Sequence, residues 1–134
     1  MQANDKHPQN GPHREFYAGD ELAAEGAYRD GKRHGPWKYY HKNGRLQAAG
    51  EYVSGEFHGY WEWWRANGER LQEGAFDMGS QTGPWRRYYD TGQLWDEGEY
   101  ERGKKVGLWT VYDKAGAVKQ TKVFSRGIPR GSQR

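Results

Sequence analysis

Aromatic residues and glycines recur along this chain with a fixed period of 24 residues, and they account for most of its apolar pattern. Complete units begin at Gly26, Gly50, Gly74 and Gly98, and a truncated unit begins at Lys122. Each complete unit carries Tyr or Phe two residues after its first position and Trp eleven residues after it. A unit of this length cannot bury an apolar face alone and does so by stacking on its neighbours. The period therefore predicts a repeat architecture.

Glycines within each unit separate short runs that are rich in Trp, Tyr, Phe and Val. One set of glycines ends short polar turns and supplies the positive φ that tight hairpins need: Gly44, Gly68, Gly92 and Gly116. A longer turn lies at residues 31–35 and its equivalents. The runs between turns are about six to nine residues long and show no helical period, which is typical of strands. We therefore predict an all-β fold, an elongated single antiparallel sheet that is a meander of stacked β-hairpin repeats with roughly nine or ten strands.

The alternation of side chains along residues 46–53 assigns the two faces of the predicted sheet. The buried face is predicted to carry Leu46, Ala48, Gly50 and Tyr52, and the solvated face Gln47, Ala49, Glu51 and Val53. In later units the solvated face carries Glu73, Glu97 and Glu99. A glycine in mid-strand usually weakens a sheet, so its recurrence between apolar positions predicts a tryptophan ring packed over bare backbone.

The repeats fill most of the chain and leave room for one domain. Residues 1–14 are polar and contain Pro8, Gly11 and Pro12, so we expect a disordered tail. Residues 16–25 resemble half a unit with one extra residue, as a terminal cap does. The predicted repeat domain covers residues 15–131, with the half cap at 16–25, units at 26–49, 50–73, 74–97 and 98–121, a partial unit at 122–131, and a tail at 132–134.

Composition and charge narrow the class of protein. The chain has 134 residues, 16% of them aromatic, and no cysteine, which excludes disulfides, thiolate metal sites and a cysteine nucleophile. The formal net charge is +3, but the basic residues gather at 122–134 and form no stripe on the repeats, so nucleic acid is not favoured as a partner. The sequence shows neither a signal peptide nor an apolar stretch long enough to span a membrane. We therefore expect a cytoplasmic protein.

No recognisable motif for catalysis is present in the sequence, so we expect no enzyme activity, no cofactor and no metal site. His34 and His58 are equivalent, but two strand spacings would separate them by about 9.5 Å, and the third copy has Thr82. A zinc ligand, by contrast, lies about 2.1 Å from its metal. The glutamates, among them Glu51 and Glu73, follow the repeat period as a solvated face does. These residues are therefore interpreted as solvated side chains.

Positions that stay large but differ between copies are candidates for binding a partner, because shared positions serve stacking. The position two after the tryptophan is one of them, and so is the position two before the recurring glutamate. Tyr, Trp and Arg dominate the binding energy of protein interfaces. The candidates are Tyr39, Phe57, Trp63, Leu71, Arg87 and Trp95. The alternative for Trp63 and Trp95 is that they only fill the aromatic layer. Weaker candidates for contact with an anionic ligand are Lys32, Arg33, Lys104 and Lys105.

Two stretches resemble a known repeat family. Residues 98–109, with the sequence GEYERGKKVGLW, and residues 43–46, NGRL, are similar to the MORN-repeat variant of bacterial proteins in the YwqK-like antitoxin family. The resemblance extends over residues 16–131 and implies an elongated, twisted sheet of stacked hairpins. Other proteins with MORN repeats are associated with membrane lipids, with dimerisation along the rod or with protein scaffolding.

From the residues and the resemblance together, we expect a non-enzymatic module that binds another protein. The specific hypothesis is an antitoxin or immunity protein that neutralises a toxin or effector partner by occluding it. One alternative is a scaffold that self-associates, and the exposed strands at the two ends of the sheet offer a place for such pairing. The other alternative is a module that binds an anionic membrane surface.

Overall fold

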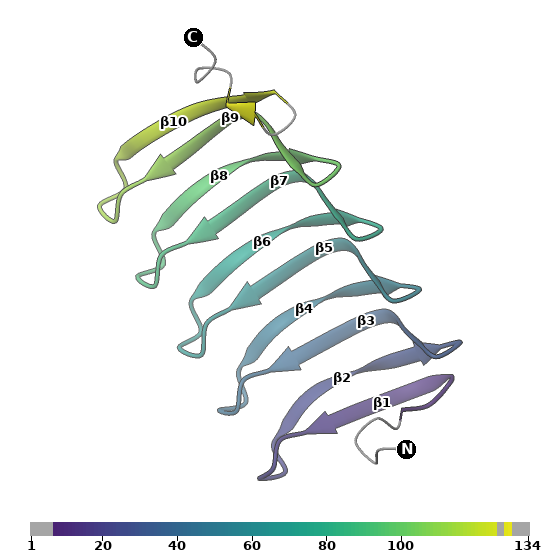
Figure 1. The fold of residues 1–134 in the computed structure, drawn as a ribbon. Coiled ribbons are helices and arrows are strands. Elements are labelled where there is room, and N and C mark those ends of the chain that lie inside the picture. Colours follow the sequence, from purple (N-terminus) through teal and green to yellow (C-terminus); the bar gives the residue numbers. More distant parts are fainter. Residues whose placement is uncertain (1–6, 126–127, 130–134) are drawn as a thin grey trace.

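The computed structural model describes residues 7–125 and 128–129, and within them the chain forms one antiparallel sheet without a helix (Figure 1). The strands are β1 (Gly11–Phe16), β2 (Leu22–Arg29), β3 (Lys32–Tyr40), β4 (Leu46–Val53), β5 (Glu56–Trp64), β6 (Arg70–Asp77), β7 (Ser80–Tyr88), β8 (Leu94–Glu101), β9 (Lys104–Tyr112), β10 (Val118–Ser125) and the two-residue β11 (Ile128–Pro129). Their order in the sheet is their order in the sequence. The predicted all-β hairpin meander is therefore confirmed.

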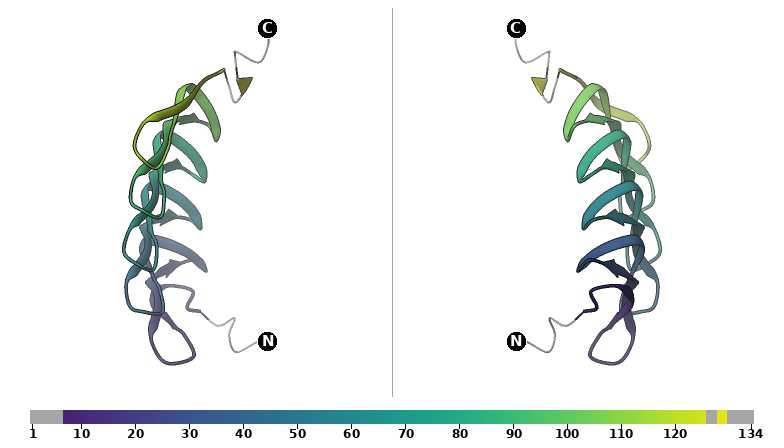
Figure 2. Two further views of the ribbon diagram at one scale, coloured as in Figure 1. Left: turned by 90° about the vertical axis from the view of Figure 1, so that its left-hand side faces the viewer. Right: turned by 90° about the vertical axis from the view of Figure 1, so that its right-hand side faces the viewer.

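The sheet is a single curved layer, as the edge-on views show (Figure 2). Each hairpin is linked to the next by the hydrogen bonds between paired strands and also by backbone hydrogen bonds at the turns. The Gly55 N–H, for example, donates to the Arg33 carbonyl at 2.9 Å, and the Gly79 N–H donates to the Phe57 carbonyl at 2.8 Å. These bonds join the same turn of successive units, which keeps the 24-residue period in register along the stack.

The first strand corrects one sequence-based expectation. Residues 11–14 were predicted to belong to a disordered tail, but they form most of β1, which pairs with β2 from Gly11 opposite Tyr28 to Phe16 opposite Leu22. Pro12 is tolerated there because β1 is the edge strand, where half of the backbone N–H groups have no ladder partner. The predictions for residues 1–6, 126–127 and 130–134 lie outside the described residues.

The core is a row of tryptophan rings, each packed over a glycine of the preceding strand. Trp37 and Trp61 are 1% exposed, although the sheet has only one layer. A Cβ atom at Gly50 would lie 2.1 Å from a ring carbon of Trp61, and Gly26, Gly74 and Gly98 are equally close to their tryptophans. Each ring also donates from Nε1 to a backbone carbonyl ten residues earlier, as Trp61 does to Glu51 at 2.9 Å. The predicted packing of a ring over bare backbone is confirmed.

A bulge in every second strand changes the predicted faces. Tyr39 pairs with Ala48, but its neighbour Tyr40 pairs with Leu46, so Gln47 has no partner of its own. Leu46 therefore lies on the face opposite Ala48, and Gln47 turns toward the face of Ala48 and the tryptophans. The predicted assignment of Leu46 to the buried face and of Gln47 to the solvated face is wrong for this reason. The tryptophan side of the sheet is called the aromatic face below.

Candidate binding site

Four of the six predicted partner-binding residues lie together on the aromatic face. Tyr39 of β3, Phe57 and Trp63 of β5 and Leu71 of β6 line one hollow of about 370 Å³, and the buried ring of Trp61 lies among them. Leu71 is the bulge residue equivalent to Gln47, and the bulge is what turns its side chain toward this face. We call this site the aromatic hollow.

The walls of the aromatic hollow are held by ring packing. Trp63 stacks on Trp61 at a centroid distance of 5.8 Å and lies 5.9 Å from Trp85. The Tyr39 hydroxyl is hydrogen bonded to the Tyr52 hydroxyl at 2.8 Å. Burial, reinforced by this hydrogen bond, raises the pKa of Tyr39 well above its ordinary value, so the tyrosine is neutral at physiological pH. The rings of the hollow therefore offer a rigid, neutral aromatic surface to a ligand.

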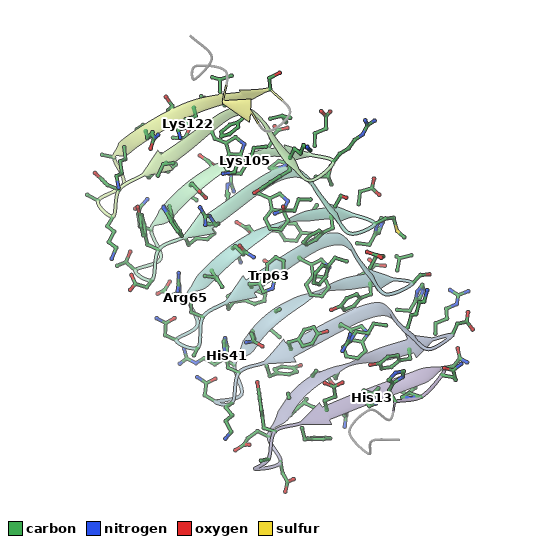
Figure 3. All side chains as sticks on the ribbon, viewed as in Figure 1. His13, His41, Trp63, Arg65, Lys105 and Lys122 are labelled. Atoms are coloured by element: carbon green, nitrogen blue, oxygen red, sulfur yellow. The ribbon has the colours of Figure 1, made fainter. Side chains whose placement is uncertain are left out.

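Two polar side chains lie at the rim, on the side of the hairpin turns. His41 Nε2 donates to the Trp64 carbonyl at 2.8 Å, and an Arg65 guanidinium nitrogen donates to the Tyr88 carbonyl at 3.0 Å. Each bond links one unit to the next, so both side chains are fixed in place. Figure 3 shows Trp63 over the middle strands, with His41 and Arg65 beside the neighbouring turns. Neither residue was predicted from the sequence, although both occupy the same position of the unit.

The other two predicted residues form a second site further along the sheet, with Arg87 on β7 and Trp95 on β8. The Arg87 guanidinium carbon lies 3.9 Å from the centre of the Trp95 ring. The guanidinium also binds Asp96 through two hydrogen bonds of 3.1 and 2.6 Å, and the Asp96 side chain is only 5% exposed. These hydrogen bonds raise the pKa of Arg87 above its ordinary value. Arg87, Trp95 and Asp96 line a hollow of about 190 Å³ together with Lys105 and Lys122, which we call the cationic hollow.

The weaker candidates for anion contact do not form one patch. Lys32 on β3 and Lys104 on β9 are six strand spacings apart, or about 29 Å. Arg33 lies on the aromatic face, with its guanidinium carbon 5.2 Å from the centre of the Trp37 ring. Lys105 lies there too, with Nζ 4.7 Å from the centre of the Trp109 ring. This arrangement gives little support to a flat basic surface for a membrane.

The opposite face contains a buried carboxylate that was expected to be solvated. Glu73 is 9% exposed, and it accepts hydrogen bonds from the hydroxyls of Tyr60 and Tyr88 and from the guanidinium of Arg70. Burial alone would raise the pKa of Glu73, but these three partners lower it below its ordinary value. Burial and the bond to Glu73 in turn raise the pKa of Tyr88 to about 12. The prediction of a solvated Glu73 is therefore wrong.

The hydrogen bond between this carboxylate and a tyrosine hydroxyl recurs in other units. Tyr40 donates to Glu25 at 2.6 Å, and Tyr112 donates to Glu97 at 2.7 Å. In the remaining unit the glutamate is replaced by alanine and the tyrosine by tryptophan, at positions 49 and 64. The hydroxyl and the carboxylate thus appear together and disappear together. A carboxylate satisfied in this way by a hydroxyl of its own hairpin holds the strands and is not poised for proton transfer.

The two equivalent histidines also have structural partners. His34 Nδ1 accepts from the Ser54 N–H at 3.3 Å, and His58 Nδ1 accepts from the Met78 N–H at 3.2 Å. Both histidines therefore bind the backbone of the next unit, at residues with positive φ of 50° and 46°. Their recurrence reflects this turn, which the sequence alone did not indicate.

Part of the repeat region is similar to a known family. Two segments match the family model described as MORN repeat variant. They are residues 33–54 and residues 81–102. The two matches begin 48 residues apart, which is two periods, and each covers a pair of neighbouring strands, β3 with β4 and β7 with β8. Residues 57–78, between them, form the equivalent pair β5 and β6.

The matches to MORN repeats indicate a repeat-based binding module. No curated protein matches the chain. In the part of the chain that the structure describes, no helix has the length and apolar character needed to cross a membrane.

Proposed function

We propose that this chain is a non-enzymatic antitoxin or immunity-type protein that binds a toxin or effector in the cytoplasm and blocks it by occlusion. The observation that carries the proposal is the aromatic hollow. Tyr39, Trp63 and Phe57 are large, rigid and partly exposed, and side chains of this kind act as anchors in protein interfaces. The match to MORN repeats supports a binding module. The resemblance of residues 98–109 and 43–46 to the antitoxin family supports the class of partner.

The dimensions of the sheet also support a protein partner. Nine spacings separate β1 from β10, which gives a stack of about 43 Å. Strands of eight or nine residues give a width of about 28 Å. One face therefore presents on the order of 1,200 Å², whereas a stable interface needs about 800 Å² from each partner. A partner bound to this face would have a comparable area of its own surface covered. Its substrate could then be excluded sterically, without any chemical reaction catalysed by the antitoxin.

Two leucine variants test the proposal. Leu71→Glu places a charge in the aromatic hollow, whereas Leu108→Glu places the same charge on the opposite face, where Leu108 is already 60% exposed. We expect affinity purification of the tagged full chain from its source organism to yield one stoichiometric partner with the wild type and Leu108→Glu, but not with Leu71→Glu. Both variants must have circular dichroism spectra like that of the wild type.

The activity of the captured partner decides the finer part of the proposal. Expressed alone in a surrogate host, the partner should stop growth, and co-expression of the wild type or Leu108→Glu should restore it. A partner that is harmless when expressed alone would refute the antitoxin role. Recovery of the chain itself as the sole captured protein would replace the proposal with the self-associating scaffold.

A further inference from the structure

The aromatic face changes its chemistry along the stack. Its middle part, around β5, is the aromatic hollow, in which the charged side chain of the lining, Arg65, lies at the rim. Its end near β10 is the cationic hollow. Lys105 there occupies the repeat position of Phe57, and Lys122 occupies the position that is glycine in earlier units. Figure 3 shows Lys105 and Lys122 at the same end of the sheet, well separated from Trp63. A partner that lies along this face therefore meets two different environments in sequence.

The charge of the cationic hollow is not balanced by its own acid. Asp96 is the acidic side chain of its lining, and it is already bound by Arg87 through two hydrogen bonds. None of the ion pairs found among the described residues involves Lys105 or Lys122. Lys105 Nζ lies over the rings of Trp109 and Phe124, at 4.7 and 5.5 Å from their centres, which holds its charge on this face. The hollow thus carries an excess of about two positive charges that an anionic group can neutralise.

The distance between the two sites fits an extended peptide. Phe57 and Trp63 lie on β5, and Lys105 lies on β9, four strand spacings away, which is about 19 Å. An extended chain advances about 3.3 Å per residue, so about six residues span this distance. The two hollows can therefore be occupied by side chains of one continuous segment that crosses the strands.

We propose that the partner is bound through one extended segment that carries an aromatic or large aliphatic side chain and, about six residues away, one or two acidic side chains. This inference rests on the proposed function and specifies the chemistry of the partner. The apolar side chain occupies the aromatic hollow beside Trp63 and Leu71. The carboxylates are bound by Lys105 and Lys122. Because two lysines beside a buried aspartate form a point-like site, they suit side-chain carboxylates better than the continuous phosphate backbone of a nucleic acid.

The test is selection from a random 12-residue peptide library displayed on phage, with the full chain as bait. The wild type should enrich peptides with an aromatic or large aliphatic residue and an acidic residue about six positions apart. Two charge-matched double variants serve as further baits: Lys105→Gln with Lys122→Gln, and Lys38→Gln with Lys42→Gln. Lys38 and Lys42 are exposed, the first on the opposite face and the second in a hairpin turn. The acidic preference should vanish with the first pair and persist with the second.

An enriched peptide then gives the quantitative result. In fluorescence anisotropy at low salt, Lys105→Gln with Lys122→Gln should weaken binding of the peptide at least fivefold, and should change binding of its Glu-to-Gln form less than twofold. Leu71→Glu should abolish binding of both forms. Equal binding of the acidic and amide forms, or no enrichment of any peptide, would overturn the inference. The proposed function would still stand in that case if the captured partner were lost with Leu71→Glu but retained with Leu108→Glu.

Discussion

Four tryptophans provide most of the core at the scale of single residues, because each one lies against a position without a side chain. Trp85, which is 4% exposed, covers Gly74, and a Cβ atom at Gly74 would lie 2.1 Å from Trp85 Cδ2. Gly74 does not have a positive φ, so its backbone would accept alanine without strain. The reason for glycine at this position is therefore the ring above it.

A double-mutant cycle checks this explanation. We expect Trp85→Ala to lower the free energy of unfolding by about 3–5 kcal/mol, and Gly74→Ala to lower it by about 1–3 kcal/mol through overpacking. In the Trp85→Ala background, Gly74→Ala should cost almost nothing, because the ring that it would strike is absent. Urea unfolding of the four proteins measures both terms. An equal cost of Gly74→Ala in the two backgrounds would contradict the explanation.

Glu73 gives a second prediction at this scale, and its sign follows from its lowered pKa. A carboxylate whose pKa is lower in the folded protein stabilises the fold above its ordinary pKa of 4.5, and this contribution is lost as the pH falls through the lowered value. We expect Glu73→Gln to cost about 2 kcal/mol near pH 7, because hydrogen bonds to a charged group are lost. The difference from the wild type should shrink toward pH 3.

Urea midpoints at several pH values test this expectation. Glu51→Gln is the matched control, because Glu51 lies on the same face but is exposed. Its effect should be within about 0.5 kcal/mol at every pH. A cost of Glu73→Gln that does not change between pH 7 and pH 3 would show that the charge of Glu73 is not what stabilises the hairpin.

At the scale of the element, β1 is the strand whose role the sequence concealed. Besides the ladder between β1 and β2, the segment before β1 contacts the turn after β2. There the Gln9 carbonyl accepts a hydrogen bond from the Gly31 N–H at 2.8 Å. The His13 ring also packs edge-on against Tyr28 at 5.3 Å. β1 and the residues that lead into it thus cover β2, a strand with two buried side chains.

Truncation tests the importance of β1. Deletion of residues 1–16 should lower the melting temperature by at least about 5 °C and should promote aggregation, because β2 then becomes an uncovered edge. Deletion of residues 1–6 is the control and should leave the melting temperature unchanged within about 1 °C. Differential scanning fluorimetry with light scattering measures both effects. Equal melting temperatures of the two truncated proteins would mean that β1 adds nothing to the stability of the sheet.

The hairpin meander, the turn positions and the stacking of tryptophan over glycine could be predicted from the sequence, because each depends on a residue type that recurs with the period. The bulge at Gln47 could not, because an extra residue in a strand leaves the period unchanged and only the pairing of Tyr40 with Leu46 reveals it. The same bulge explains why Leu71 and Trp95, predicted as partner contacts, reach the aromatic face.

The candidate site shows a similar division. Trp63 and Arg87 could be selected by comparing equivalent positions, but the two residues lie in two separate hollows, which the repeat pattern does not indicate. Asp96 was missed because it replaces alanine or glutamine of other units at a position that was not compared. Its pairing with Arg87 across the ladder shows that both residues depart from the repeat together. A comparison of position pairs across copies would have found this signal.

At the scale of the whole molecule, the stack behaves as a series of interchangeable units, since each strand pairs only with its neighbours in sequence within the described residues. Removal of residues 74–97, one complete unit, should therefore preserve the fold. It removes Arg87, Trp95 and Asp96 but keeps Lys105 and Lys122, and it should move these two lysines two strand spacings, or about 9.6 Å, closer to the aromatic hollow. The preferred separation of apolar and acidic residues in a bound peptide should then fall from about six to about three.

Peptide selection with this shortened protein, next to the wild type, measures the change in separation. The circular dichroism spectrum of the shortened protein shows whether the sheet persists. An unchanged separation of about six would mean that the two hollows are not occupied by one segment.

The order of the strands also determines how the protein bears a load. Hydrogen bonds in an antiparallel ladder run perpendicular to the strands, so in this sheet they point along the stack from β1 to β10. Under tension along the stack, each pair of strands bears the same force, and its hydrogen bonds break one after another from one end. Tension along the strands would instead shear all the bonds of a ladder at once. The molecule is therefore mechanically soft along its length and stiff across it.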